Sequence, residues 1–440
     1  MSKKIRLLAA CLLACFSIAA LILVGGPVPA TLAQSGAVAP TNTKSAAVAA
    51  ATTDVLQETS TLRKLSILRP VKSGAQSRAE IERMIMKNLD EDTTPQEMHA
   101  SEIALKKLGL VPPDFQYRPF IVSLLTEQVA GYYDPKEQEF FLADWIDVDG
   151  QKPVMAHELT HALQDQHFNL RRFEKWPQGD SDAELAAHAL IEGDATLAMK
   201  FYIERSPVRA IAMLRSIEAS GSSSEQIDKA PRALRESLLF PYEKGLVWVN
   251  SLYKRDGSWD RVSQAYTELP QSTEQILHVE KYYAREAPVT LTLPDFASTL
   301  GSGWKRVDYD VNGEWSYYLI LDEYLKSTAE SRRAAEGWGG DRYAVYESKN
   351  KGEVMIAQLT SWDTENDAIE FFDAYAKRTA RRYAGATETP SAQPSMLRTW
   401  QATGEGTIML ERRGSRVLIL EGLPDKANTR SLLQTIWQKV

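Results

Sequence analysis

Apolar residues recur at helical spacing through most of the first 280 positions of this chain. One segment, residues 77–89, opens with serine and glutamate three positions apart, the pattern of a capping box, and continues with an apolar stripe. A second, residues 94–109, opens with threonine and proline and ends at glycine. The pattern predicts a mainly helical region that extends to about residue 283.

The hydrophobic period changes near residue 130. Residues 129–133 and 139–142 are short runs rich in aromatic and branched side chains, and Asp134-Pro135-Lys136 between them favours a turn. We therefore expect a β-hairpin. Its free edge can pair with an extended peptide, although a hairpin with a purely structural role fits the pattern nearly as well.

The last hundred residues indicate a separate unit. Gly337–Gly340 is interpreted as a flexible hinge, so a boundary is expected after residue 335. The predicted order is ββαβββα, which implies an antiparallel sheet with helices on one face. The expected strands are residues 342–348, 354–361, 396–401, 406–411 and 416–421, and the expected helices follow Asp363 and span residues 425–439. The fold class is α+β, and this unit, residues 336–440, is interpreted as an accessory domain because it shows no catalytic constellation.

The N-terminus has the pattern of a targeting segment. Three basic residues precede an apolar run from Leu7 to Val24, and small residues then offer cleavage after Ala30 or Ala33. Residues 1–33 are interpreted as a secretory signal, or as an uncleaved membrane anchor because the run has 18 residues; a lipoprotein box at Cys11 is a further alternative. Residues 34–54, rich in Ala, Ser and Thr, are expected to form a flexible linker.

Composition limits the partners and the metal ligands that we expect for the mature chain. Removal of residues 1–33 deletes three basic residues and no acidic one, which takes the formal net charge from −7 to −10 and argues against a nucleic-acid partner. The only two cysteines, Cys11 and Cys15, lie in this leader. A mature chain without cysteine has no disulfide and must bind any metal through histidine and carboxylate.

The strongest motif lies at residues 157–161, His-Glu-Leu-Thr-His, inside a segment that is predicted to be helical. Histidines four positions apart leave the same face of a helix, as two ligands of a tetrahedral zinc ion require. Glu158 lies beside them, where its carboxylate can take a proton from a metal-bound water. The motif predicts Zn²⁺ bound by His157 and His161.

Three residues compete for the third ligand position. His167 completes the spacing of the metzincin metalloproteases, but Gln164 stands where those proteins need glycine, and in a continuous helix His167 lies about 240° away from His161. Glu192 and His188 lie four positions apart in a second helical segment that begins near Ser181. His188 could be a ligand, a hydrogen-bond partner of one, or a packing residue.

At this second helix the chain resembles the gluzincin class of zinc metallopeptidases. In that class a glutamate on the helix after His-Glu-x-x-His is the third ligand, and Glu192 matches that role. Many gluzincins place an aspartate four residues further on, where this chain has Thr196. Asp194 lies two positions on and is expected to point elsewhere, which leaves the partner of the ligand histidine in doubt.

Two downstream residues are candidates for stabilising the oxyanion, Tyr242 and His278. Their structural alternatives are a core aromatic and a helix C-terminal cap. His99 has no partner in the sequence and is given no role.

Together these observations predict an extracytoplasmic zinc peptidase whose catalytic domain spans residues 55–335, with protein or peptide as substrate and Glu158 as general base. A non-catalytic envelope binding protein with a structural metal site, and a peptidoglycan-directed metallohydrolase, are the alternatives. The sequence indicates no oligomeric state.

Overall fold

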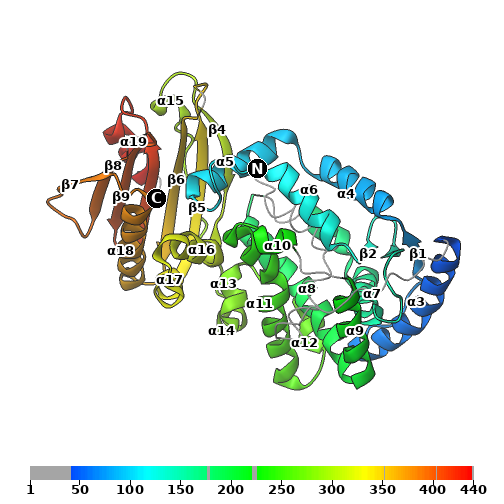
Figure 1. Cartoon of the computed structure of the whole chain (residues 1–440). Coiled ribbons are helices and arrows are strands. Elements are labelled where there is room, and N and C mark those ends of the chain that lie inside the picture. The colour runs from blue at the N-terminus through cyan, green and yellow to red at the C-terminus, as the bar shows by residue number, and fades with distance from the viewer. Residues whose placement is uncertain (1–40, 176–178, 221–224, 351, 403, 439–440) are drawn as a thin grey trace.

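The computed structural model describes residues 41–175, 179–220, 225–350, 352–402 and 404–438. The chain forms an α+β structure in which a helical region and a C-terminal sheet region lie side by side (Figure 1). The leader predicted at residues 1–33 lies outside the described residues. Among the residues that are described, no helix is long and apolar enough to cross a membrane.

The helical region contains most of the helices and a small sheet. Its helices are α3 (Thr41–Arg63), α4 (Arg78–Asp92), α5 (Pro95–Leu108), α6 (Tyr117–Gln128), α7 (Lys152–Phe168), the 3-10 turn η1 (Leu170–Lys175), α8 (Ser181–Glu204), α9 (Pro207–Ser220), α10 (Glu225–Lys229), α11 (Arg232–Asp256), α12 (Asp260–Ala265), α13 (Thr273–Leu277) and α14 (Val279–Ala284). The capping boxes predicted at residues 77 and 94 are present at the starts of α4 and α5.

The flexible linker predicted at residues 34–54 is wrong over its second part. Residues 41–54 are the first turns of α3. Val48 and Val55 are buried, in a cluster shared with the β3 residue Phe140 and the α7 residue Leu159. Alanine has the highest helix propensity of all residues, so a few buried valines are enough to hold this Ala-rich segment as a helix against the rest of the protein.

The small sheet contains the predicted hairpin. Strands β2 (Gly131–Asp134) and β3 (Glu139–Ala143) pair antiparallel, and β1 (Lys72–Gln76) pairs parallel to β3 on its other side. The order β1-β3-β2 places β2 at the edge of this sheet, in contact with α7. The hairpin prediction is therefore confirmed, and the edge strand lies beside the motif helix.

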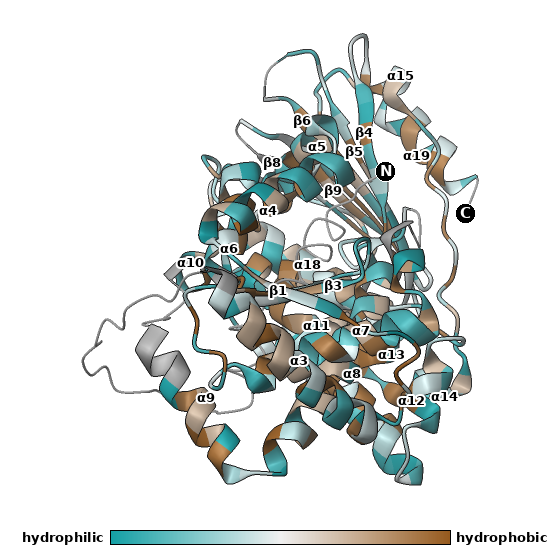
Figure 2. Ribbon diagram, turned by 90° about the vertical axis from the view of Figure 1, so that its right-hand side faces the viewer, coloured by the Kyte–Doolittle hydropathy of each residue, from teal (hydrophilic) through white to brown (hydrophobic). Residues whose placement is uncertain are grey.

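Helices α7, α8 and α11 form the centre of the helical region and lie side by side in Figure 2, where apolar segments run along them. The packing of α8 against α11 depends on two glycines. A Cβ atom on Gly193 would lie 2.3 Å from the carbonyl carbon of Gly245, and one on Gly245 would lie 2.2 Å from the carbonyl oxygen of Ala189. Because any side chain would force the two backbones apart, these glycines fix how closely α11 covers α8.

The sheet region contains seven antiparallel strands in the order β4-β5-β6-β10-β9-β8-β7. They are β4 (Lys305–Asp310), β5 (Trp338–Glu347), β6 (Val354–Trp362), β7 (Thr387–Thr389), β8 (Leu397–Ala402), β9 (Gly406–Arg413) and β10 (Arg416–Leu423). The region's helices are α15 (Ala297–Leu300), α16 (Gly313–Leu325), α17 (Thr328–Ala335), α18 (Glu365–Arg382) and α19 (Thr429–Trp437). The predicted antiparallel sheet is confirmed.

Three details of that prediction are wrong. The unit begins before residue 336, because β4 pairs with β5 across the predicted boundary. The predicted hinge at residues 337–340 lies at the start of β5, where Trp338 is buried and the strand has a bulge. The helices cover both faces, because Val345 packs in the cluster that includes α18 whereas its neighbour Tyr346 packs in the cluster that includes α19. Successive side chains of a strand point to opposite faces.

A buried aspartate joins the two regions. Asp310, at the end of β4, accepts hydrogen bonds from the backbone N–H and the hydroxyl of Ser181, the first residue of α8. Within the helical region, the next residue, Asp182, accepts from the backbone N–H and hydroxyl of Thr273, the first residue of α13. Carboxylates favour helix N-termini because they satisfy free N–H groups there. The sheet region thereby fixes the start of the helix that carries Glu192.

Candidate metal centre

Helix α7 presents both motif histidines on one side, as predicted. The ring centroids of His157 and His161 lie 4.7 Å apart, and both side chains are fully buried. One ligand atom from each of His157, Glu158 and His161 lies within 4.8 Å of the other two. Burial lowers the pKa of His157 to about 4, although its hydrogen bond to the carboxylate of Glu192 acts in the opposite direction, so this imidazole is neutral at neutral pH, the form that ligates metals.

Glu192 of α8 approaches both imidazoles. Its Oε2 atom lies 3.1 Å from His157 Nε2 and 3.5 Å from His161 Nε2. Ligand atoms held about 2.0–2.1 Å from a tetrahedral zinc ion are about 3.3 Å apart, so these separations suit three ligands of one ion. Burial alone would raise the pKa of Glu192, but the two imidazoles lower it to about 2.

The hydrogen bonds of His161 indicate which ring nitrogen is left to face Glu192. Its Nδ1 lies 2.8 Å from Gln164 Oε1, while Gln164 Nε2 donates to Ile191 O and to Asp194 Oδ2. The amide orientation is therefore fixed, Gln164 Oε1 is an acceptor, and Nδ1 of a neutral His161 carries the proton. Its Nε2 lone pair, which has no hydrogen-bond partner among the described residues, faces the carboxylate of Glu192. Two lone pairs in this arrangement favour a cation between them, so the residues fit a metal ion.

Glu158 lies beside these ligands and next to the edge strand. Its Oε2 accepts a 2.6 Å hydrogen bond from the backbone N–H of Tyr133 in β2, and its Oε1 has no hydrogen-bond partner in the described part of the chain. Burial, together with the nearby charge of Glu192, raises its pKa well above the ordinary value. A carboxylate with a raised pKa and one free oxygen is suited to proton transfer.

Asp194 belongs to this centre, contrary to the prediction that it points elsewhere. It binds Gln164, the guanidinium of Arg63 and the hydroxyl of Tyr266, and all of these side chains are buried. Gln164, which the motif marks only as a missing glycine, could have been found because position i+3 from His161 shares its helix face. Arg63 and Tyr266 carry no local signal, since they lie in α3 and just after α12.

The other candidate histidines differ in their surroundings. His167 is partly exposed and its Nε2 lies 2.8 Å from the carbonyl of Ser66, so the metzincin alternative is wrong for this structure. His188 is partly exposed on α8 and lies within electrostatic range of His161 and Glu192. His99 pairs with Glu347 at the surface.

The two candidates for stabilising the oxyanion lie in different surroundings. The ring of Tyr242 stacks on His157 with centroids 6.2 Å apart and an angle of 28°, so it covers the metal centre from α11. His278 instead pairs with Glu314 of α16 at 3.0 Å, a hydrogen bond that raises the pKa of the imidazole. It caps the C-terminus of the short helix α13, which matches its structural alternative.

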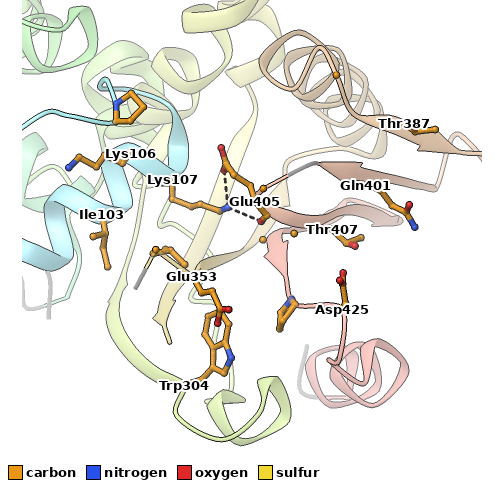
Figure 3. Close-up of a pocket in the computed structure, with 18 residues that line it drawn as sticks. Ile103, Lys106, Lys107, Trp304, Glu353, Thr387, Gln401, Glu405, Thr407 and Asp425 are labelled. Atoms are coloured by element: carbon orange, nitrogen blue, oxygen red, sulfur yellow. Dashed lines mark hydrogen bonds and ion pairs between the residues drawn. The ribbon is translucent and has the colours of Figure 1, made fainter. Parts of the chain in front are cut away.

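The centre is closed in this structure. His157, Glu158 and His161 have no exposed surface and Glu192 is 2% exposed. An open groove of about 1130 Å³ lies elsewhere, where α5 meets the ends of strands in the sheet region (Figure 3). Its lining includes Lys107 and Glu405, which pair with each other, and none of the metal-centre residues.

Comparison with known proteins concerns the sheet region. Residues 299–433 match a family model described as a domain of unknown function (DUF8575). The match begins within α15 and ends within α19, so it does not include the metal centre. No curated protein and no solved structure matches the chain.

Proposed function

We propose that this protein is a zinc-dependent peptidase of gluzincin type, with His157, His161 and Glu192 as the metal ligands. The observation that carries the proposal is the approach of one Glu192 oxygen to both imidazole nitrogens, with Glu158 beside them. Zinc, when bound, acts as a Lewis acid and lowers the pKa of water. The mainly helical domain that bears this centre, with its hairpin before α7, is interpreted as zincin-like.

In this proposal Glu158 is the general base. The backbone N–H of Tyr133 holds one carboxylate oxygen and leaves the other to accept a proton from the attacking water. The same oxygen can then deliver the proton to the leaving amine. In this proposal Tyr242, whose ring stacks on His157, stabilises the oxyanion of the substrate.

A protein or peptide is the proposed substrate. Strand β2 is at the edge of its sheet, and a backbone N–H on that edge already meets the base. An extended peptide can add to such an edge as a further strand. The leader at residues 1–33 supports an extracytoplasmic location, either secreted, periplasmic or held by an N-terminal anchor, and the acidic mature charge gives no reason to propose a nucleic-acid partner.

One observation favours a second candidate, a structural metal site in a non-catalytic envelope protein. The ligands are 2% exposed or less, as is usual for closed structural sites. Glu158 argues for catalysis, because a structural site needs no base and this carboxyl is buried without a cationic partner in the described part of the protein. Burial of such a group without a compensating partner is unfavourable, and a catalytic role gives a reason for its presence.

The test uses purified mature protein, its zinc content, and hydrolysis of unfolded casein beside the Glu158→Gln variant. We expect about one zinc per chain in both proteins and hydrolysis by the wild type alone. Zinc in both proteins with no hydrolysis of casein, peptides or purified peptidoglycan would support the structural site. Hydrolysis of peptidoglycan without casein would instead move the substrate to cell-wall cross-links.

A further inference from the structure

A buried chain of side chains connects α3 to the metal centre. Arg63, the last residue of α3, binds Asp194 of α8 through Nε and Nη2. Asp194 Oδ2 accepts from Gln164 Nε2 at 3.0 Å, and Gln164 Oε1 accepts from His161 Nδ1 at 2.8 Å. All four side chains have no exposed surface. The chain therefore links a segment just after the leader to a metal ligand.

We propose that Gln164 is the positioning residue for His161, and that Asp194 and Arg63 hold Gln164 in the required orientation. This inference rests on the proposed metal centre and adds α3 to it. The charge pair acts on the ligand through a neutral amide. His161 is thereby fixed with its proton on Nδ1 and its Nε2 lone pair directed at Glu192.

The series Arg63–Asp194–Gln164–His161 is called the relay below, and its specificity depends on the orientation of the Gln164 amide. A flipped amide would point its NH₂ group at the Nδ1 proton of His161 and its oxygen at the carboxylate of Asp194. Asp194 is itself held by the Tyr266 hydroxyl at 2.9 Å and by Arg63, whose guanidinium contacts Ser263 and lies 4.4 Å from the centre of the Trp259 ring. With Asp194 held by these two residues, only one amide orientation satisfies every donor.

Because the relay begins at Arg63 of α3, it affects how the metal centre is assembled. An unpaired buried carboxylate is strongly unfavourable, so Asp194 reaches its stable arrangement only when Arg63 is in place. The metal centre is then complete only after α3 has packed on α7 and α8. An intact helix α3 is accordingly a requirement for tight metal binding and not only for stability.

The decisive variant is Gln164→Leu, which removes the amide without breaking the Arg63–Asp194 ion pair. Its matched control is Gln166→Leu on the same helix, because Gln166 binds the backbone of residues 68 and 69 and touches no metal ligand. Zinc affinity is measured by chelator competition, and the visible spectrum of the Co²⁺-substituted protein reports ligand geometry. We expect a 10–100-fold loss of affinity and an altered spectrum for Gln164→Leu, against less than a threefold change for Gln166→Leu.

A second experiment reverses the polarity of the link between positions 164 and 194. Gln164→Glu keeps an acceptor for His161 but removes the donor to Asp194, and it should weaken zinc binding. Asp194→Asn added to that variant supplies a new donor, so the double variant should bind zinc more tightly than the two single effects predict. Additive effects in this cycle would contradict the relay.

The outcomes separate this inference from the proposed function. If the wild type binds no metal, the metal centre itself is refuted. If the wild type binds zinc and Gln164→Leu binds it within threefold with an unchanged Co²⁺ spectrum, the centre stands and the positioning role is overturned. Retained tight binding in Arg63→Lys, which preserves the charge but not the two-pronged geometry, would confine the relay to α7 and α8.

Discussion

Each region of this protein contains a fully buried arginine–carboxylate pair. In the helical region Arg63 binds Asp194, and in the sheet region Arg378 of α18 binds Glu421 of β10. None of these four side chains has exposed surface. Burial of a charged pair is therefore common to both regions and does not by itself mark a functional centre.

The two networks differ in where they end. Glu421 also accepts from Arg382 and Tyr375, and the two arginines donate to the carbonyls of residues 106–108 at the end of α5. Carbonyls in the last turn of a helix lack the usual i+4 donor, and Lys106 O is met otherwise by the C-cap N–H of Gly109. The arginines therefore complete the attachment of α5 to the sheet. The Arg63 network instead ends at a lone pair of His161 that faces Glu192. Each network leaves a buried nitrogen without a hydrogen-bond partner among the described residues, Nε of Arg378 and Nε2 of His161. The nitrogen of His161 lies 3.5 Å from a carboxylate oxygen of Glu192, within the proposed metal centre.

The largest effect is expected when the ligands are removed. The double variant His157→Ala/His161→Ala deletes two of three donors, so it should contain no zinc and show no hydrolysis, as measured by elemental analysis and casein assay. Glu192→Ala should lower zinc affinity at least about 10-fold, the scale that even outer-shell losses reach. Full zinc occupancy in the double variant would show that zinc binds without these histidines. The Arg63 network would then not lead to the metal, and the contrast between the two networks would be lost.

Glu158→Gln should give the next largest effect, confined to catalysis. The amide keeps an acceptor for Tyr133 but cannot carry the proton, so the rate of peptide hydrolysis should fall roughly 10²–10⁴-fold. Zinc content and thermal stability should remain close to those of the wild type. A fully active variant would show that another group is the base.

Glu421→Gln should affect stability without affecting the metal. It leaves buried arginines without their carboxylate, and breaking such a pair lowers the free energy of unfolding by about 3–5 kcal/mol. Glu388→Gln, which removes the partly exposed pair with Arg398, is the control and should cost about 1 kcal/mol or less. Urea titration gives both values. Loss of zinc affinity in Glu421→Gln at unchanged stability would erase the distinction between the two networks.

The smallest effect is expected from His167→Ala. This imidazole is partly exposed and makes one hydrogen bond to a backbone carbonyl, so the free energy of unfolding should change by no more than about 0.5 kcal/mol. Zinc affinity should stay the same in the chelator assay. Loss of zinc from this variant would instead identify His167 as the third ligand, as in the metzincins, in place of Glu192.

Local patterns were predicted well because their causes lie within a few residues. Capping boxes, the hairpin turn and the helix that bears His157 and His161 depend on contacts three to five positions apart. Glu192 was suggested by resemblance, and the structure brings it to the histidines. The linker prediction was wrong because α3 has few apolar residues, and composition cannot show that Val48 has a partner surface. The hinge at residues 337–340 was wrong for the same reason, since pairing with β6 makes it a strand.

By itself, the sequence determined the motif, its helix and the antiparallel character of the C-terminal sheet. Only the tertiary structure decided which residues support the motif: Asp194 lies 131 positions from Arg63 and 72 from Tyr266. It also decided that helices cover both faces of the sheet and that Arg63 of α3 reaches the residues of the proposed metal centre. The physical reason is range. Backbone preferences and side-chain periodicity act between near neighbours, whereas buried polar groups take whichever partner the packing of distant segments brings within hydrogen-bond distance.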